Sequence, residues 1–119
     1  MKPASFGEYL RDCREIRVET DRTFSIRQVA KRVGIEPSYL SKIEREEQPP
    51  PGEETIRRLA QELGQDADVL LAMAGKVSSD LLDVIRARPA LFAELLRQLK
   101  TLPDKAVLRL VREVRDGEW

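Results

Sequence analysis

The side chains of this chain that are best placed for chemistry are hydrogen-bond donors between residues 37 and 45. Ser38, Tyr39, Ser41 and Lys42 follow one another closely in a short polar and basic stretch. Hydroxyl and ammonium groups can donate to phosphate oxygens and to the polar edges of nucleic-acid bases. The stretch therefore indicates binding chemistry, and the elements around it decide what it can bind.

Catalytic chemistry has little support in the sequence. The acidic pairs at residues 46–47 and 53–54 flank a proline loop, and no nucleophile or metal ligand accompanies them. The chain has no histidine, and its one cysteine, Cys13, is interpreted as a small core residue. We therefore expect no enzyme activity, no cofactor, no metal site and no intrachain disulfide.

Two short helices separated by a tight turn are predicted to position the donors. Ser25 can cap the first helix, at about residues 25–33, and Gln28 stands where it would complete a capping box. Gly34 can adopt the left-handed conformation that ends a helix. Pro37 suits the first turn of a second helix, because the N–H it lacks is not needed there. The pattern predicts helix, turn and helix, with the donors on the outer face.

The segment from Val29 to Ile35, followed by Pro37 to Arg45, resembles the phage-repressor/Cro-like helix-turn-helix family, also called the xenobiotic-response-element family. The small residue, the glycine and the apolar residues stand at the family's offsets, and the pattern covers about residues 6–74. The resemblance implies an all-α, sequence-specific DNA-binding protein whose second motif helix enters the major groove.

That docking mode implies the residues that contact double-stranded DNA. Lys42 can donate to guanine, and Ser38 can bond a base edge or a phosphate. Pro37 stands where many family members carry a polar base-reading residue, so more of the recognition is left to DNA shape. For Ser25 and Gln28, helix capping alone is an equal alternative. The expected DNA-contacting set is Ser25, Arg27, Gln28, Pro37, Ser38, Tyr39, Ser41, Lys42 and Arg45.

A first helix is predicted at residues 6–18. Its expected apolar stripe is Phe6, Tyr9, Leu10, Cys13 and Ile16. The resemblance implies a structural ion pair between Arg14 of this helix and Glu44, and the alternative is two independent surface charges. The link at residues 19–24 is longer than the family's usual connection, so either the first helix runs on or a loop protrudes.

Helices at residues 53–63 and 66–74 complete a five-helix head, residues 1–75, which we interpret as the DNA-binding domain. Three further helices, at residues 79–88, 90–100 and 103–115, form a second region over residues 76–119. Short amphipathic helices enclose little core alone, so this region must pack on the head or on a partner copy. The expected dimerisation residues are Leu91, Phe92, Leu95, Leu99, Val107, Leu110, Val111 and Val114.

The charges are distributed unevenly along the chain. The net charge is zero, but residues 1–45 hold ten Lys/Arg and seven Asp/Glu, a balance of +3. Residues 46–119 hold the remaining eleven and fourteen, a balance of −3. Phosphate contact needs a local basic face and not a basic protein, so the distribution is compatible with DNA binding.

We therefore predict a transcriptional regulator, a repressor that acts as a homodimer on a palindromic operator. No apolar stretch is long enough to cross a membrane and no secretion signal is visible, so the expected location is the cytoplasm, in a bacterium or encoded by a phage. Two alternatives stay open: the antitoxin of a toxin–antitoxin pair, and a repressor inactivated by a partner metallopeptidase.

The domain interpretation predicts a difference in assembly between the whole chain and its head. Sedimentation of residues 1–75 should show a monomer, whereas the full chain should be a dimer. A truncated chain that is equally dimeric would contradict the assignment of dimerisation to residues 76–119.

Overall fold

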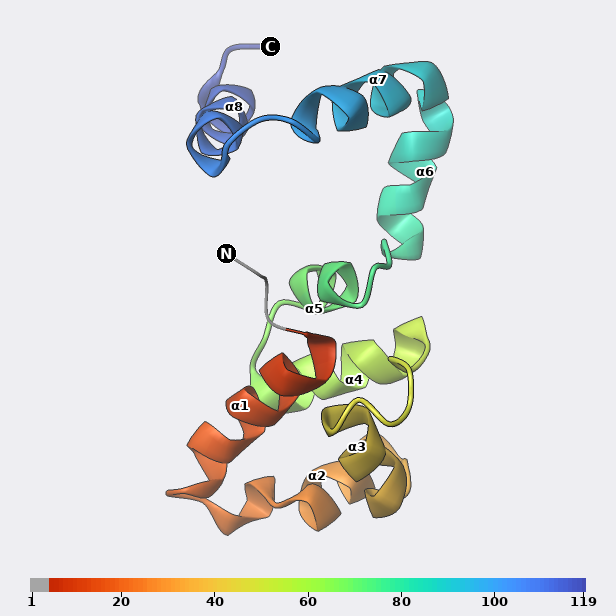
Figure 1. Ribbon diagram of the computed structural model, residues 1–119, viewed down its shortest axis with the longest axis vertical. Coiled ribbons are helices and arrows are strands. Elements are labelled where there is room, and N and C mark those ends of the chain that lie inside the picture. Colours follow the sequence, from red (N-terminus) through yellow and green to blue (C-terminus); the bar gives the residue numbers. More distant parts are fainter. Residues whose placement is uncertain (1–4) are drawn as a thin grey trace. The chain divides into compact units, whose positions relative to one another are not determined.

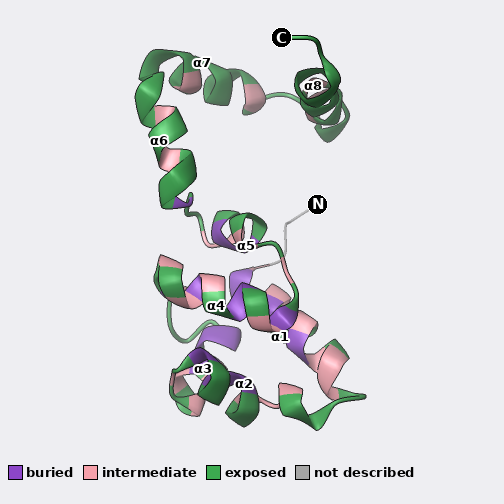
Figure 2. Cartoon of the chain, turned by 180° about the vertical axis from the view of Figure 1, so that it is seen from behind, coloured by how far each residue is buried: buried purple, intermediate pink, exposed green. Residues whose placement is uncertain are grey.

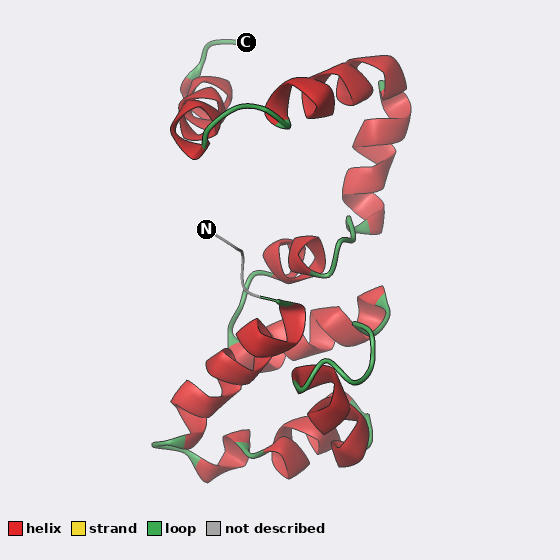
Figure 3. Cartoon of the chain, in the orientation of Figure 1, coloured by secondary structure: helices red, strands yellow, loops and turns green. Residues whose placement is uncertain are grey.

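The computed structural model describes residues 5–119, and within that range every regular element is a helix (Figures 1 and 3). The predicted all-α fold class is therefore confirmed. The elements are α1 Phe6–Val18, the 3₁₀ turn η1 Arg22–Phe24, α2 Ile26–Val33, α3 Pro37–Glu44, α4 Glu53–Leu63, α5 Ala67–Met73, α6 Ser79–Ala87, α7 Pro89–Leu99 and α8 Asp104–Asp116. No helix among the described residues is long and apolar enough to cross a membrane.

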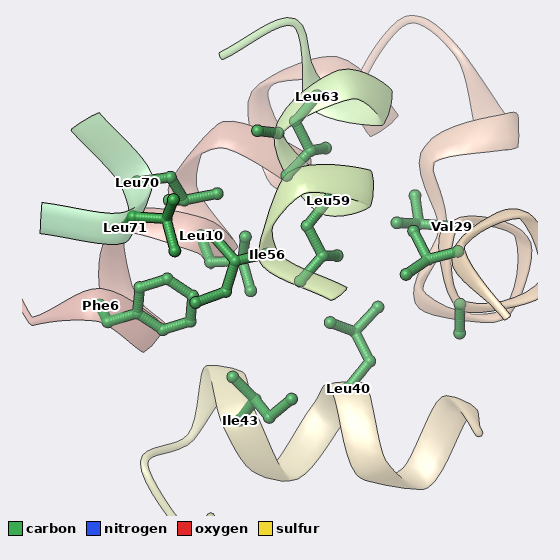
Figure 4. Packing of buried hydrophobic residues seen from close by; sticks show 13 residues of the cluster. Phe6, Leu10, Val29, Leu40, Ile43, Ile56, Leu59, Leu63, Leu70 and Leu71 are labelled. Carbon is green, nitrogen blue, oxygen red and sulfur yellow. The ribbon is translucent and has the colours of Figure 1, made fainter. Parts of the chain in front are cut away.

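The chain divides into two compact units, Met1–Ser78 and Ser79–Trp119. The first contains α1 to α5, and α4 packs against both α2 and α5 while α1 packs against α3. Ile56, Leu59 and Leu63 of α4 are almost completely buried among apolar side chains from the other helices (Figure 4). This core of thirteen buried apolar residues is what holds the head together.

The turn between α2 and α3 follows from the backbone freedom of one glycine. Gly34 has φ 86°, and its amide and that of Ile35 both donate to the Ala30 carbonyl, at 2.8 and 3.0 Å. Only glycine adopts this left-handed conformation at no steric cost. At the other end of α2, the Ser25 hydroxyl accepts from the Gln28 amide.

The capping box expected at Ser25 is only half made. The Ser25 amide donates to the Arg22 carbonyl of η1, at 3.1 Å, and not to the Gln28 side chain. The link at residues 19–24 thus ends in a 3₁₀ turn that supplies the acceptor itself, and Gln28 stays exposed.

The predicted apolar stripe of α1 is wrong at one end. Ile16 is 69% exposed, whereas Arg14 is only 7% exposed. The buried residues Phe6, Leu10 and Arg14 are four apart, and the 3.6-residue repeat turns Ile16 away from that line. Ile16 was expected to face inward because it is hydrophobic. Arg14 faces inward instead, because its charge is paired with Glu44.

The ends of α1 and α3 approach each other at a glycine. The Gly7 amide donates to Oε1 of Glu46, at 2.7 Å. Glu46 has φ 62°, a left-handed conformation that L-residues with side chains seldom adopt. A Cβ atom on Gly7 would collide with the Ile43 carbonyl oxygen and would lie 2.9 Å from that of Glu44.

The second unit, α6 to α8, contains no buried residue in the structure (Figure 2). Many of its large apolar side chains are exposed, for example Leu91 at 70% and Val114 at 58%, and the others are half-buried. A fully covered apolar face is therefore formed only in the head.

The close approach of α1 to α3 predicts a strong effect of one methyl group. Gly7→Ala should lower the free energy of unfolding by about 2 kcal/mol or more, because backbone oxygens cannot move aside as a side chain would. The matched control is Gly52→Ala, where a Cβ meets nothing within 4 Å. It should lower the free energy of unfolding by no more than about 1 kcal/mol, because Gly52 is the N-cap of α4 and alanine is only a poorer cap there. Urea unfolding measures both, and equal effects would contradict the steric explanation.

Candidate nucleic-acid interface

The outer face of α3 carries the donors predicted from the sequence. Ser38 and Lys42 are exposed and four residues apart, so they lie on the same side of the helix. Arg45, at the C-cap, is also exposed. The inner face is held by Leu40 and Ile43, which are 0% and 1% exposed. The donor side chains therefore project from a helix whose opposite side is locked in the core.

The three other predicted residues of α3 are less accessible. Pro37, Tyr39 and Ser41 are half-buried, and the Tyr39 ring packs against the core cluster. Only part of the Tyr39 ring is thus available to a ligand. Pro37 occupies the first turn, where no side-chain cap is present.

The start of α2 presents a second set of polar groups. Arg27 and Gln28 are exposed, and Ser25 caps the helix. The first amides of a helix and its dipole both favour an anion. Capping and anion contact are compatible for Ser25, because its hydroxyl accepts from the backbone and can still donate.

A hollow of about 210 Å³ lies where α1, α2 and α3 meet. Of the predicted DNA-contacting residues, the structure brings Ser41 and Arg45 together there. Their neighbours around the hollow are Arg11, Arg14, Glu15, Ile26 and Glu44. Arg45 is held at the rim by its Nε donating to the Ser41 carbonyl and by an ion pair with Glu47 at 3.2 Å.

Arg14 and Glu44 lie together below this rim. Nε of Arg14 donates to Oε2 of Glu44 at 2.7 Å, and Nη2 donates to Oε1 at 3.0 Å. Nη1 donates to the Phe24 carbonyl at 3.2 Å. Both side chains are almost fully buried, with 9% and 3% of their surface exposed. The pair is bidentate and joins α1, α3 and the link before α2.

The link contains a contact that sequence reasoning missed. The guanidinium groups of Arg17 and Arg32 both lie over the Phe24 ring, each 5.3 Å from the ring centroid. Arg32 also forms an ion pair with Glu62 of α4 at 2.6 Å. The only signal in the sequence was the unusual length of the link. Three of the head's arginines, counting Arg14, are thereby committed to structure.

Two exposed carboxylates of the head are stabilised in their charged form. The pKa of Glu15 is lowered chiefly by the hydrogen bond from Arg11, and that of Asp21 chiefly by the Thr23 hydroxyl. A lowered pKa contributes stability that is present above the ordinary carboxyl pKa and is lost as the pH falls through the lowered value. Near neutral pH these two negative charges persist beside the basic residues.

The bidentate geometry predicts energetic coupling between Arg14 and Glu44. Arg14→Met or Glu44→Leu alone should lower the free energy of unfolding by about 3–5 kcal/mol, because each leaves a buried charge without its partner. The double variant should cost less than the sum, with a coupling of about 1–3 kcal/mol. A double-mutant cycle in urea measures it.

The exposed pair Arg11 and Glu15 provides the matched control. Their side chains are 53% and 46% exposed, and they stand four residues apart on α1. Arg11→Met and Glu15→Leu should couple by about 0.5 kcal/mol or less. Equal coupling free energies in the two cycles would show that burial of Arg14 and Glu44 does not strengthen their interaction.

The head corresponds to a known domain type. A family model described as a helix-turn-helix domain matches residues 5–73, more than half of the chain. No curated protein and no solved structure matches. The matched range contains α1 to α5, with the α2–α3 motif and its exposed donors at its centre. This chain belongs to the helix-turn-helix domain family.

Proposed function

We propose that this protein is a sequence-specific DNA-binding transcriptional regulator, a repressor of the phage-repressor/Cro-like type that binds a palindromic operator as a homodimer. Membership of the helix-turn-helix family supports DNA binding. The observation that carries the finer proposal is the exposed face of α3, where Ser38, Lys42 and Arg45 project from a helix fixed in the core. A rigid helix holds base-reading groups in a constant register.

The contacts divide into base reading and phosphate binding. Lys42, with Ser38 beside it, reads base edges in the major groove. Arg27 and Arg45 contact phosphates on either side, together with the amides at the start of α2. Because Pro37 offers no donor at the first turn of α3, part of the specificity comes from DNA shape.

Homodimerisation follows from the limited size of one head. A single recognition helix makes few base contacts, and two heads on a palindrome multiply their specificity. The exposed apolar side chains of α7 and α8 support the second unit as the dimerisation region. Such a regulator acts in the cytoplasm, where its operator is. The antitoxin and peptidase-regulated alternatives instead require a different protein on this region.

The proposal is tested by selecting bound DNA from a random pool with the full chain and footprinting the selected sequences. The expected result is an inverted repeat with both half-sites protected. Lys42→Ala should cost about 1–3 kcal/mol of discrimination at one base pair of each half-site. Arg45→Gln should weaken binding to all sequences and reduce the slope of log K against log salt by about 1 for each bound head.

Lys100→Ala is the matched control, because it removes a positive charge from an exposed position of the second unit. It should leave both base preference and salt slope unchanged. A pool with no enriched sequence would refute the proposed function. Unaltered base preference in Lys42→Ala would remove this side chain from base reading.

A further inference from the structure

An apolar hollow lies within the second unit, between α7 and α8. It has a volume of about 470 Å³. Its walls are Leu95 and Leu99 of α7 together with Val107, Leu110, Val111, Val114 and Arg115 of α8. Apart from Arg115, every lining residue is aliphatic. An open groove of this composition is stabilised when another apolar surface covers it.

The spacing along α8 indicates what can cover it. Four aliphatic residues of α8 line the groove, at 107, 110, 111 and 114, whereas Leu108 does not. The four are separated by three, one and three positions, which reads the same in both directions. A second α8 running antiparallel therefore places Val107 of one copy opposite Val114 of the other, and Leu110 opposite Val111. All four groove-lining aliphatic residues of α8 then meet an aliphatic partner.

Charges at the rim of the groove match the same arrangement. Arg115, which pairs with the adjacent Asp116 at 2.9 Å, lines the groove at the C-terminal end of α8, and Asp104 begins the helix. The two are eleven residues apart, about three full turns, so they lie on the same side. Asp104 makes no ion pair in the described part of the chain. An antiparallel copy brings Asp104 of each chain beside Arg115 of the other, whereas a parallel copy gathers both aspartates at one end and both arginines at the other.

The outward side of α8 is suited to solvent. Arg109 and Arg112 lie on the side of the helix opposite the aliphatic stripe, and Arg109 pairs with Glu113 of its own helix at 3.4 Å. The second unit as a whole carries eight Lys/Arg and seven Asp/Glu between residues 79 and 119, a balance of +1. Net charge therefore offers little resistance to self-association.

We propose that the groove between α7 and α8 receives α8 of a second copy of this chain, antiparallel, in a symmetric interface where each copy's α8 fills the other's groove. The inference rests on the homodimer of the proposed function and specifies its surface, orientation and register. Such an interface is self-complementary, as a two-fold dimer requires. The two-fold symmetry also matches the two halves of a palindromic operator.

Disulfide trapping tests the orientation in the full chain. Cys13→Ala removes the single natural cysteine. In that background Val107→Cys and Val114→Cys together should give a covalent dimer under mild oxidation, because the two positions face each other across the interface. Neither substitution alone should do so, because each is separated from its own copy by about 10 Å along the axis. Efficient cross-linking of either single variant would overturn the antiparallel register.

Sedimentation equilibrium gives a second readout that does not depend on oxidation. Val111→Asp places a charge in the groove and should weaken the dimer about 100-fold or more. Val111 is 50% exposed in the single chain, so the head should unfold at the same temperature as in the unaltered protein. Arg112→Asp puts the same residue on the outward side and should change the dissociation constant of the dimer by less than about threefold.

The outcomes also separate this inference from the proposed function. A full chain that selects an operator but is monomeric, or whose assembly ignores Val111→Asp, overturns the α8 interface and leaves DNA binding standing. A dimer with the predicted cross-links that selects no DNA sequence refutes the proposed function and supports the interface.

Discussion

The buried contact of Arg14 with Glu44 is the interaction on which the arrangement of the head depends. The guanidinium donates twice to the carboxylate and once to the Phe24 carbonyl, so three elements share one charged group. Desolvating two charges is costly, and the cost is offset only when the donors and acceptors are satisfied. No buried side-chain N or O atom among the described residues lacks a hydrogen-bond partner. The position of α3 against α1 is therefore set by directional bonds as well as by apolar packing.

Further contacts hold the ends of the motif from other sides. Glu46, just beyond the end of α3, accepts from the Gly7 amide in the first turn of α1, and its left-handed conformation costs free energy. Phe24, in contact with Arg17 and Arg32, anchors the link that leads into α2. Because α2 and α3 are fixed at these points, the exposed groups between them are presented on a rigid frame. Because these contacts engage arginine side chains of the head, fewer basic side chains are available to bind phosphate than the number of Lys and Arg residues in the sequence suggests.

The two units differ in how they satisfy their apolar residues. The head buries thirteen of them within one chain, whereas α6 to α8 bury none. Three short helices are too few to close a core around themselves. The partly exposed aliphatic stripe of α8 and the small net charge of the second unit, +1, are consistent with a surface that completes its packing by association. In the function proposed above, the head would supply the contacts to DNA and the second unit the pairing of two chains.

Local features of the sequence determined the helices themselves. Capping residues, prolines and the glycine at position 34 act within a few residues, so they located each helix to within one or two positions. The same information identified α3 as the helix with the exposed donors, and the spacing of aliphatic residues along α8 can be read from the sequence alone. The resemblance to a known family added the pairing of Arg14 with Glu44, which no local rule supplies.

Only the tertiary structure decided which side chains those helices bring together. Gly7 meets Glu46 across 39 positions, and Arg32 meets Glu62 across 30. The burial of Arg14 in place of Ile16, the stack around Phe24 and the half-buried Tyr39 likewise depend on how helices cross. Hydrophobic periodicity reports which side of a helix is apolar on average. It carries no information about partners that are distant in the sequence. An arginine whose charge is paired with such a partner can therefore be buried while an isoleucine of the same helix stays exposed to water.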